Sequence, residues 1–117
     1  MRYEQPPQMT RAELEEAFCC GNGEKIRDAL ISAFYSEKGD WVQGWGLKLS
    51  NHPDPIARYG AAVVLGNTAV RHRREIDLLK SLEAVQKLSA DSEERVRAAA
   101  KDSLRDVLHA IKLKGTS

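Results

Sequence analysis

Three ten-residue segments of this sequence align with one another without gaps, and this repeat limits what the chain can fold into. The segments are KIRDALISAF at 25–34, IARYGAAVVL at 56–65 and RVRAAAKDSL at 95–104. Each has an arginine at its third position, a small residue at its fifth and a large apolar residue at its tenth. Self-similarity of this kind is typical of chains that stack one helical unit on the next.

Apolar residues recur at helical spacing over most of the chain, which predicts six helices joined by short connections. In the second helix Ile26, Ala29, Leu30, Ala33 and Phe34 follow the i, i+3, i+4, i+7, i+8 pattern of one buried face. Alanine and leucine are frequent, and aromatic residues make up 6%, which favours helix over sheet. We therefore expect an all-α fold with no strand and with consecutive helices antiparallel. The expected helices cover about 10–20, 24–36, 40–49, 55–69, 78–88 and 91–112.

Capping residues mark where four of these helices begin. A T-x-x-E capping box starts at Thr10, and Asp54 precedes a proline at the first helical position, where the missing N–H does no harm. Asp40, with Gln43 three residues on, is expected to cap the third helix. Asp91 starts a D-x-x-E sequence and is expected to cap the sixth.

The last two helices carry long apolar stripes, which predict buried helix faces. The stripe of the fifth consists of Leu78, Leu79, Leu82, Val85 and Leu88. That of the sixth consists of Val96, Ala99, Ala100, Ser103, Leu104, Val107, Leu108 and Ile111. Leu104 is expected to be a core position, because it aligns with the large apolar residue of the repeat.

The stretch DWVQGWG at 40–46 holds both tryptophans of the chain. Trp45 shares a helix face with Val42 and Leu49, so it is expected in the core. Trp41 lies on a flanking face with Lys48, where packing and partner binding are both open interpretations. The two glycines of this stretch each cost up to about 1 kcal/mol relative to alanine in a helix, which usually serves close packing.

Length and charge indicate one ordinary globular domain. The chain has 117 residues and a net charge of +1, so no global field draws it to nucleic acid or to an anionic membrane. No apolar run approaches the roughly 20 residues of a membrane span, and the first residues lack a signal-peptide core. We expect a cytoplasmic protein with an extended lead-in at 1–9, a single domain at 10–113 and a frayed end at 114–117.

The sequence shows no arrangement of residues typical of catalysis. His52, His72 and His109 stand in no metal-ligand spacing, and no glycine-rich phosphate loop or nucleophile elbow is present. Cys19 and Cys20 are adjacent, which suits neither a disulfide nor a zinc site, and we expect both reduced and one of them buried. We expect no enzymatic activity, no cofactor and no bound metal.

The segments DPIARYGAAVVLG and EERVRAAAKDSLRD resemble the first helix of a HEAT-like repeat, in the bacterial form also seen in phycobilisome lyases. The resemblance covers about residues 24–113. It implies a short α-solenoid of antiparallel helix pairs, in which the small residue of the repeat allows neighbouring helices to approach closely. The arginines of the repeat, Arg27, Arg58 and Arg97, are expected to reach acids such as Asp54 or Asp91 in adjacent loops.

The fold fixes no activity, so two functions remain open. The first is a non-enzymatic protein-binding module, most concretely an immunity or antitoxin-type inhibitor that occludes a partner such as a toxin domain. The alternative is a nucleic-acid-binding HEAT-like protein that uses the basic cluster at 71–74, although this cluster is one loop rather than a stripe. Tryptophan and arginine often anchor interfaces, so we expect one partner-binding face made by Trp41, Lys48, Arg71, Arg73 and Arg74.

Overall fold

The computed structural model describes residues 9–116, which form six α-helices and no strand. This confirms the expected all-α fold and the number of helices. The helices are α1 (Arg11–Phe18), α2 (Gly23–Ser36), α3 (Gly39–Leu49), α4 (Pro55–Arg71), α5 (Leu78–Leu88) and α6 (Glu94–Thr116).

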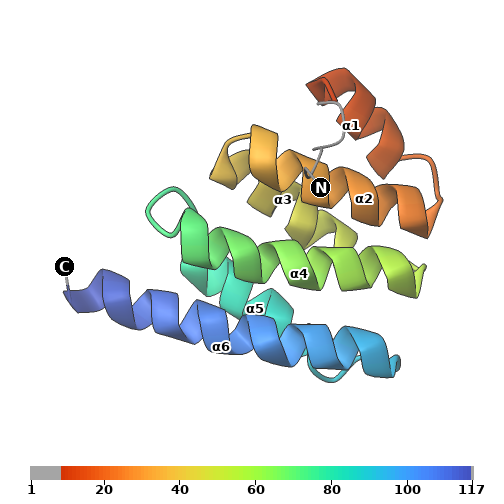
Figure 1. Ribbon diagram of the computed structural model, residues 1–117. Helices are drawn as coiled ribbons and strands as arrows, with labels where there is room; N and C mark the ends of the chain where they lie inside the picture. Colours follow the sequence, from red (N-terminus) through yellow and green to blue (C-terminus); the bar gives the residue numbers. More distant parts are fainter. Residues whose placement is uncertain (1–8, 117) are drawn as a thin grey trace, which may run out of the picture.

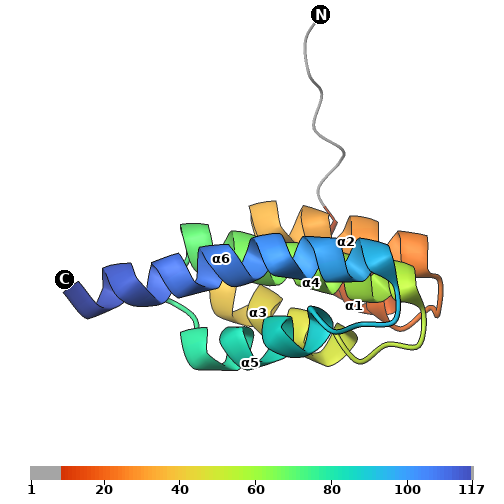
Figure 2. The same ribbon diagram turned by 90° about the horizontal axis from the view of Figure 1, so that it is seen from below.

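The helices stack in two layers (Figures 1 and 2). One layer holds α2, α4 and α6, which lie side by side and run in the same direction. The other holds α3, which packs on α4, and α5, which packs on α6. The first helix, α1, packs on α2 at one end of the stack, and α6 lies at the other end. This is the arrangement of stacked helix pairs, while the assignment to HEAT-like repeats stays a prediction.

Side-chain caps begin most of these helices. Thr10 accepts a hydrogen bond from the Glu13 N–H, and the Glu13 carboxylate accepts one from the Thr10 N–H, which confirms the capping box and lowers the pKa of Glu13. Asp54 accepts from the Ile56 N–H at 2.9 Å and so caps α4 as expected, and its second oxygen accepts from the Gly23 N–H at 3.2 Å.

The predicted cap of α3 is wrong. The N-cap residue is Lys38, which makes no side-chain cap bond, and Asp40 lies inside the first turn, where it accepts from the Trp41 N–H. Gln43 is buried instead of closing a cap. Its amide donates to the Asp77 carbonyl at 2.6 Å and accepts from the Asp77 N–H at 3.0 Å, so it joins α3 to the start of α5.

Small residues let the helices of the first layer approach one another closely. A Cβ added at Gly60 of α4 would lie 2.9 Å from the Cα of Arg27 in α2, so the small position of the repeat is a point of backbone contact. A Cβ added at Gly66 would meet Ser103 of α6, whose hydroxyl donates to the Ala62 carbonyl at 2.6 Å. Larger side chains at these positions would push the helices apart.

The three repeat arginines differ in what they contact. Arg58 donates to both carboxylate oxygens of Asp91, at 2.8 and 3.1 Å, which confirms the expected contact with an adjacent loop. Arg97 donates to the carbonyls of Asp91 and of its neighbour Ser92. Arg27 pairs only with the adjacent, exposed Asp28 among the ion pairs of the described residues, so its expected contact with a loop acid is wrong.

The core is centred on α4, which contacts α2, α3, α5 and α6. Leu65, at the large apolar position of the repeat, is completely buried. Leu104 at the same position of α6 is only partly buried, which corrects the expected core position, because none of the other described helices covers this side of α6. The helix α6 also continues to Thr116, where a frayed end was expected from 114. Residues 1–8 of the expected lead-in lie outside the described residues.

Candidate partner-binding surfaces

An aromatic cluster joins α1 to α3. Its three rings belong to Phe18, Trp41 and Trp45, with centroids 4.6 Å apart for Phe18 and Trp45 and 6.2–6.3 Å apart for the other two pairs. Phe18 is buried, while both tryptophans are partly buried against the core. Trp45 was expected in the core and Trp41 on its flank, but the structure places both at the rim of the core.

Two cations lie over the tryptophan rings. The Arg11 guanidinium is 4.7 Å from the centroid of Trp41, and the Lys48 ammonium is 4.9 Å from the centroid of Trp45. Arg11 also donates to a carboxylate oxygen of Glu37 at 2.6 Å. Such cation–π contacts stabilise the cluster by about 0.5–1 kcal/mol each at exposed sites. Trp41 and Lys48 therefore belong to one surface, through Trp45.

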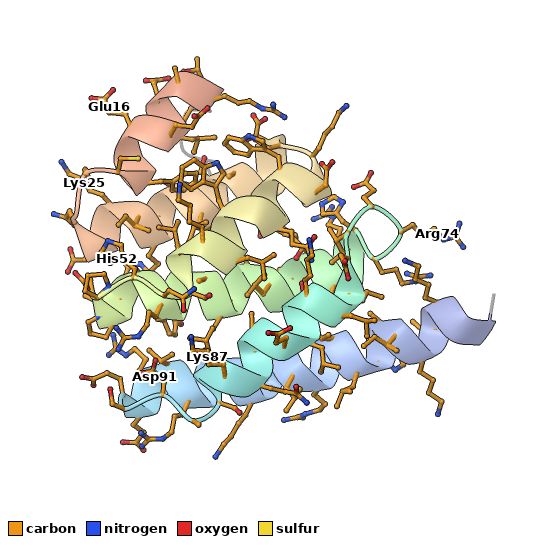
Figure 3. The ribbon with its side chains drawn as sticks, turned by 180° about the vertical axis from the view of Figure 1, so that it is seen from behind. Glu16, Lys25, His52, Arg74, Lys87 and Asp91 are labelled. Atoms are coloured by element: carbon orange, nitrogen blue, oxygen red, sulfur yellow. The ribbon has the colours of Figure 1, made fainter. Side chains whose placement is uncertain are left out.

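The basic segment 71–74 lies at the end of α4 and in the loop to α5. The Arg71 guanidinium lies 5.9 Å above the Phe34 ring, and His72 pairs with Glu75 at 3.0 Å. Arg73 is partly buried, and Arg74 is exposed and points away from the helices (Figure 3).

The five predicted binding residues thus form two groups. The described ring contacts, ion pairs and hydrogen bonds join Trp41 and Lys48 to Trp45, and Arg71 to Phe34, but none of them joins the two groups. A role of these residues in binding stays a prediction.

A third surface, at the α6 end of the stack, is one that the sequence analysis missed. Leu79 is 69% exposed and Leu108 is 49% exposed, although both belong to stripes that were expected to be buried. They flank a partly buried row on α5 and α6 that packs on the core. We call this surface the leucine face: Leu79, Leu82, Leu104, Leu108 and Ile111. Helical periodicity could not reveal this surface, because it shows which residues share a helix face and not whether another helix covers that face.

A hollow of about 590 Å³ lies at one end of the leucine face. It is lined by Ile76, Asp77, Leu78, Leu79, Ile111, Lys114 and Gly115, from the start of α5 and the end of α6. A smaller hollow of about 270 Å³ lies between the first turns of α4 and α6, beside Ile56 and Tyr59.

Arg58 and Asp91 form an ion pair that holds parts of the fold together. Hydrogen bonding from Arg58 lowers the pKa of Asp91, and the same bond raises the pKa of Arg58. Asp91 lies at the turn between α5 and α6 (Figure 3), so the pair joins this turn to α4.

The described residues offer few other candidates for a functional site. Cys19 and Cys20 are both exposed, so the expectation that one is buried is wrong, because α1 ends at Phe18 and both follow it into the turn. Among the described residues, no three His, Cys, Asp or Glu side chains are grouped as a metal ion would need. None of the described helices is long and apolar enough to cross a membrane.

Comparison with known proteins gave one informative similarity. No protein-family model matches the sequence, and no curated protein matches it. The chain is similar to a chain in the crystal structure of the CDI complex from Cupriavidus taiwanensis LMG 19424, with 31% sequence identity and a TM-score of 0.72. The match covers 93% of this chain and 96% of that one.

Proposed function

This chain belongs to the family of the matched chain in the Cupriavidus taiwanensis CDI complex, and on that premise we propose that it is an immunity-type protein that binds and occludes a toxin domain. CDI is contact-dependent inhibition, a toxin–immunity system. The observation that carries the proposal is the extent of the match, which leaves almost no part of either chain outside the alignment. Such a protein acts by binding and performs no chemistry of its own.

Two features support the proposal that this chain is the immunity protein of such a toxin–immunity pair. The sequence resembles small helical-repeat proteins, a scaffold that offers a broad surface rather than a deep pocket. The structure carries aromatic and apolar side chains that remain partly exposed, at the aromatic cluster and at the leucine face. Exposed apolar patches of this kind mark protein interaction sites. The two-layer stack likewise supports our proposal that the scaffold is a short HEAT-like solenoid.

The test is complex formation with a toxin domain, for which the products of the neighbouring genes are the candidates. We expect the two purified proteins to co-elute as one species in size-exclusion chromatography, and co-expression of this chain to restore growth to cells that produce the toxin domain. Failure of both would contradict the proposal. Binding to duplex DNA that weakens steeply with salt would favour the nucleic-acid alternative instead.

A further inference from the structure

Leu108 of the leucine face is 49% exposed, although its position is covered elsewhere in the molecule. The third repeat is offset by 39 residues from the second, so Leu104 aligns with Leu65 and Leu108 with Ala69. Leu65 and Ala69 are completely buried in α4, in the same core cluster as Val107 of α6. The helix α6 has the sequence of a covered helix, but none of the described helices covers this side of it.

In the second layer, Leu82 likewise occupies a position that is buried in the preceding helix pair. The helices α3 and α5 are both 11 residues long and are also offset by 39, so Leu82 aligns with Gln43. Gln43 is buried and bonds to Asp77 and Ser81 at the next helix pair. Leu82 is partly buried, and no described helix pair follows α5 and α6 at this end of the stack, which Figure 2 views directly.

The shape of this end suits an added helix. The hollow of about 590 Å³ continues the row of leucines between α5 and α6. The C-terminal part of α6 extends beyond the other helices and prolongs this edge (Figure 1). A groove with apolar side chains at helical spacing is the surface that binds the apolar face of an amphipathic helix.

The charged residues beside the leucine face favour one kind of binding partner. Lys101, Arg105 and Lys112 are exposed on α6, beside the leucine row, at spacings of four and seven residues. Arg105 has one weak pairing at 3.4 Å, with the exposed Asp102. A second copy related by a two-fold axis would place these cations near one another, which disfavours a dimer through this face. A partner with acidic side chains beside its apolar row complements it.

We propose that the leucine face docks an amphipathic helical segment of the toxin domain, with apolar residues against Leu79, Leu82 and Leu108 and acidic residues opposite Lys101 and Lys112. This inference rests on the proposed function and names its docking surface. The docked segment takes the place that a further helix of the stack would occupy.

The test compares substitutions to glutamate at exposed residues by isothermal titration with the toxin domain that co-elutes with this chain. Leu79→Glu combined with Leu108→Glu is expected to weaken binding at least 100-fold. Tyr35→Glu, on α2 at a residue that is 66% exposed, is the matched control and is expected to change binding less than threefold. Circular dichroism melts confirm that each variant is folded.

A second pair of variants keeps the test decisive if the leucine variant fails to fold. Lys101→Glu combined with Lys112→Glu is expected to slow association at least tenfold at low salt, whereas Lys25→Glu on α2 is not. If the wild type binds and both leucine-face variants bind equally well, the inference is wrong while the proposed function stands. If the wild type does not bind, both are wrong. A wild-type dimer that the substitutions dissociate would assign this face to a second copy and overturn the inference.

Discussion

Asp91 joins the second and third helix pairs through a single residue. Its carboxylate accepts two hydrogen bonds from Arg58, and its carbonyl accepts one from Arg97 at 2.9 Å. The side chains of Asp91 and Arg58 are 10% and 17% exposed, so solvent screens this pair less than a surface pair. The lowered pKa of Asp91 therefore reports a contribution of this carboxylate to the stability of the fold.

Removing this charge should make stability depend less on pH. We expect Asp91→Asn to lower the free energy of unfolding by about 1–3 kcal/mol at pH 7. Because the folded pKa of Asp91 lies below the unfolded value of about 3.9, its contribution is full above that value and is lost as the pH falls through the folded pKa. Urea unfolding of both proteins should therefore show a smaller difference near pH 3 than at pH 7. Asp28→Asn, at the exposed pair with Arg27, is the control and should change little. A difference that is independent of pH would contradict the assignment.

Two helical glycines should respond oppositely to alanine. Gly60→Ala places a Cβ 2.9 Å from the Arg27 Cα, so we expect a loss of about 1–3 kcal/mol despite the better helix propensity of alanine. A Cβ at Gly44 meets no atom within 4 Å, so Gly44→Ala should stabilise α3 by about 0.5–1 kcal/mol. Urea midpoints measure both. Stabilisation by both substitutions would show that α2 and α4 tolerate a wider spacing.

At the scale of the elements, features that depend on nearby residues, such as helix caps, were predicted better than features that depend on tertiary contacts. The caps at Thr10 and Asp54 are confirmed, because the bonds that make them lie within a few residues of sequence. The cap at Asp40 is wrong because Gln43 makes a contact 34 residues away, which no local pattern reveals. Helical spacing likewise placed Leu108 in a buried stripe, since periodicity shows which residues share a face and not whether another helix covers that face.

For the candidate surface, the sequence predicted which residues are exposed but not how they are grouped. Residue type singled out Trp41 and the arginines of 71–74, and the structure places all of them at least partly in solvent. Spacing along the sequence could not show that Trp41 packs towards α1 through Phe18, while Arg71 packs on Phe34 of α2. These directions follow from tertiary contacts, which separate the single expected face into two groups.

The Gln43 amide should be a major link between α3 and α5. Gln43→Met keeps the volume but leaves the N–H and carbonyl of Asp77 without these partners, so we expect a loss of about 1–3 kcal/mol. Thermal unfolding followed by circular dichroism measures it. Gln86→Met, at an exposed glutamine of α5, is the control and should stay within about 0.5 kcal/mol of the wild type. Equal melting of the two variants would mean that water replaces the bonds of Gln43 at no cost.

At the scale of the whole molecule, α4 couples the two ends of the stack. It supplies Ala57, Ala61 and Val64 to the core cluster shared with α1, α2 and α3. It also supplies Leu65 and Ala69 to the cluster shared with α5 and α6. A single helix that contributes to both clusters makes it costly for either end to unfold alone.

The position of the tryptophans allows this coupling to be measured. Both lie on α3, within the aromatic cluster, so their fluorescence reports on the α1 end of the stack, whereas far-UV circular dichroism reports on all six helices. We expect the two signals to give the same urea midpoint and the same slope, because small single domains usually unfold in one transition. A dichroism transition at lower urea than the fluorescence transition would show that α5 and α6 open first. In that case a bound partner that covers the leucine face should bring the two transitions together, since a ligand of the folded state stabilises the part of the fold that it holds.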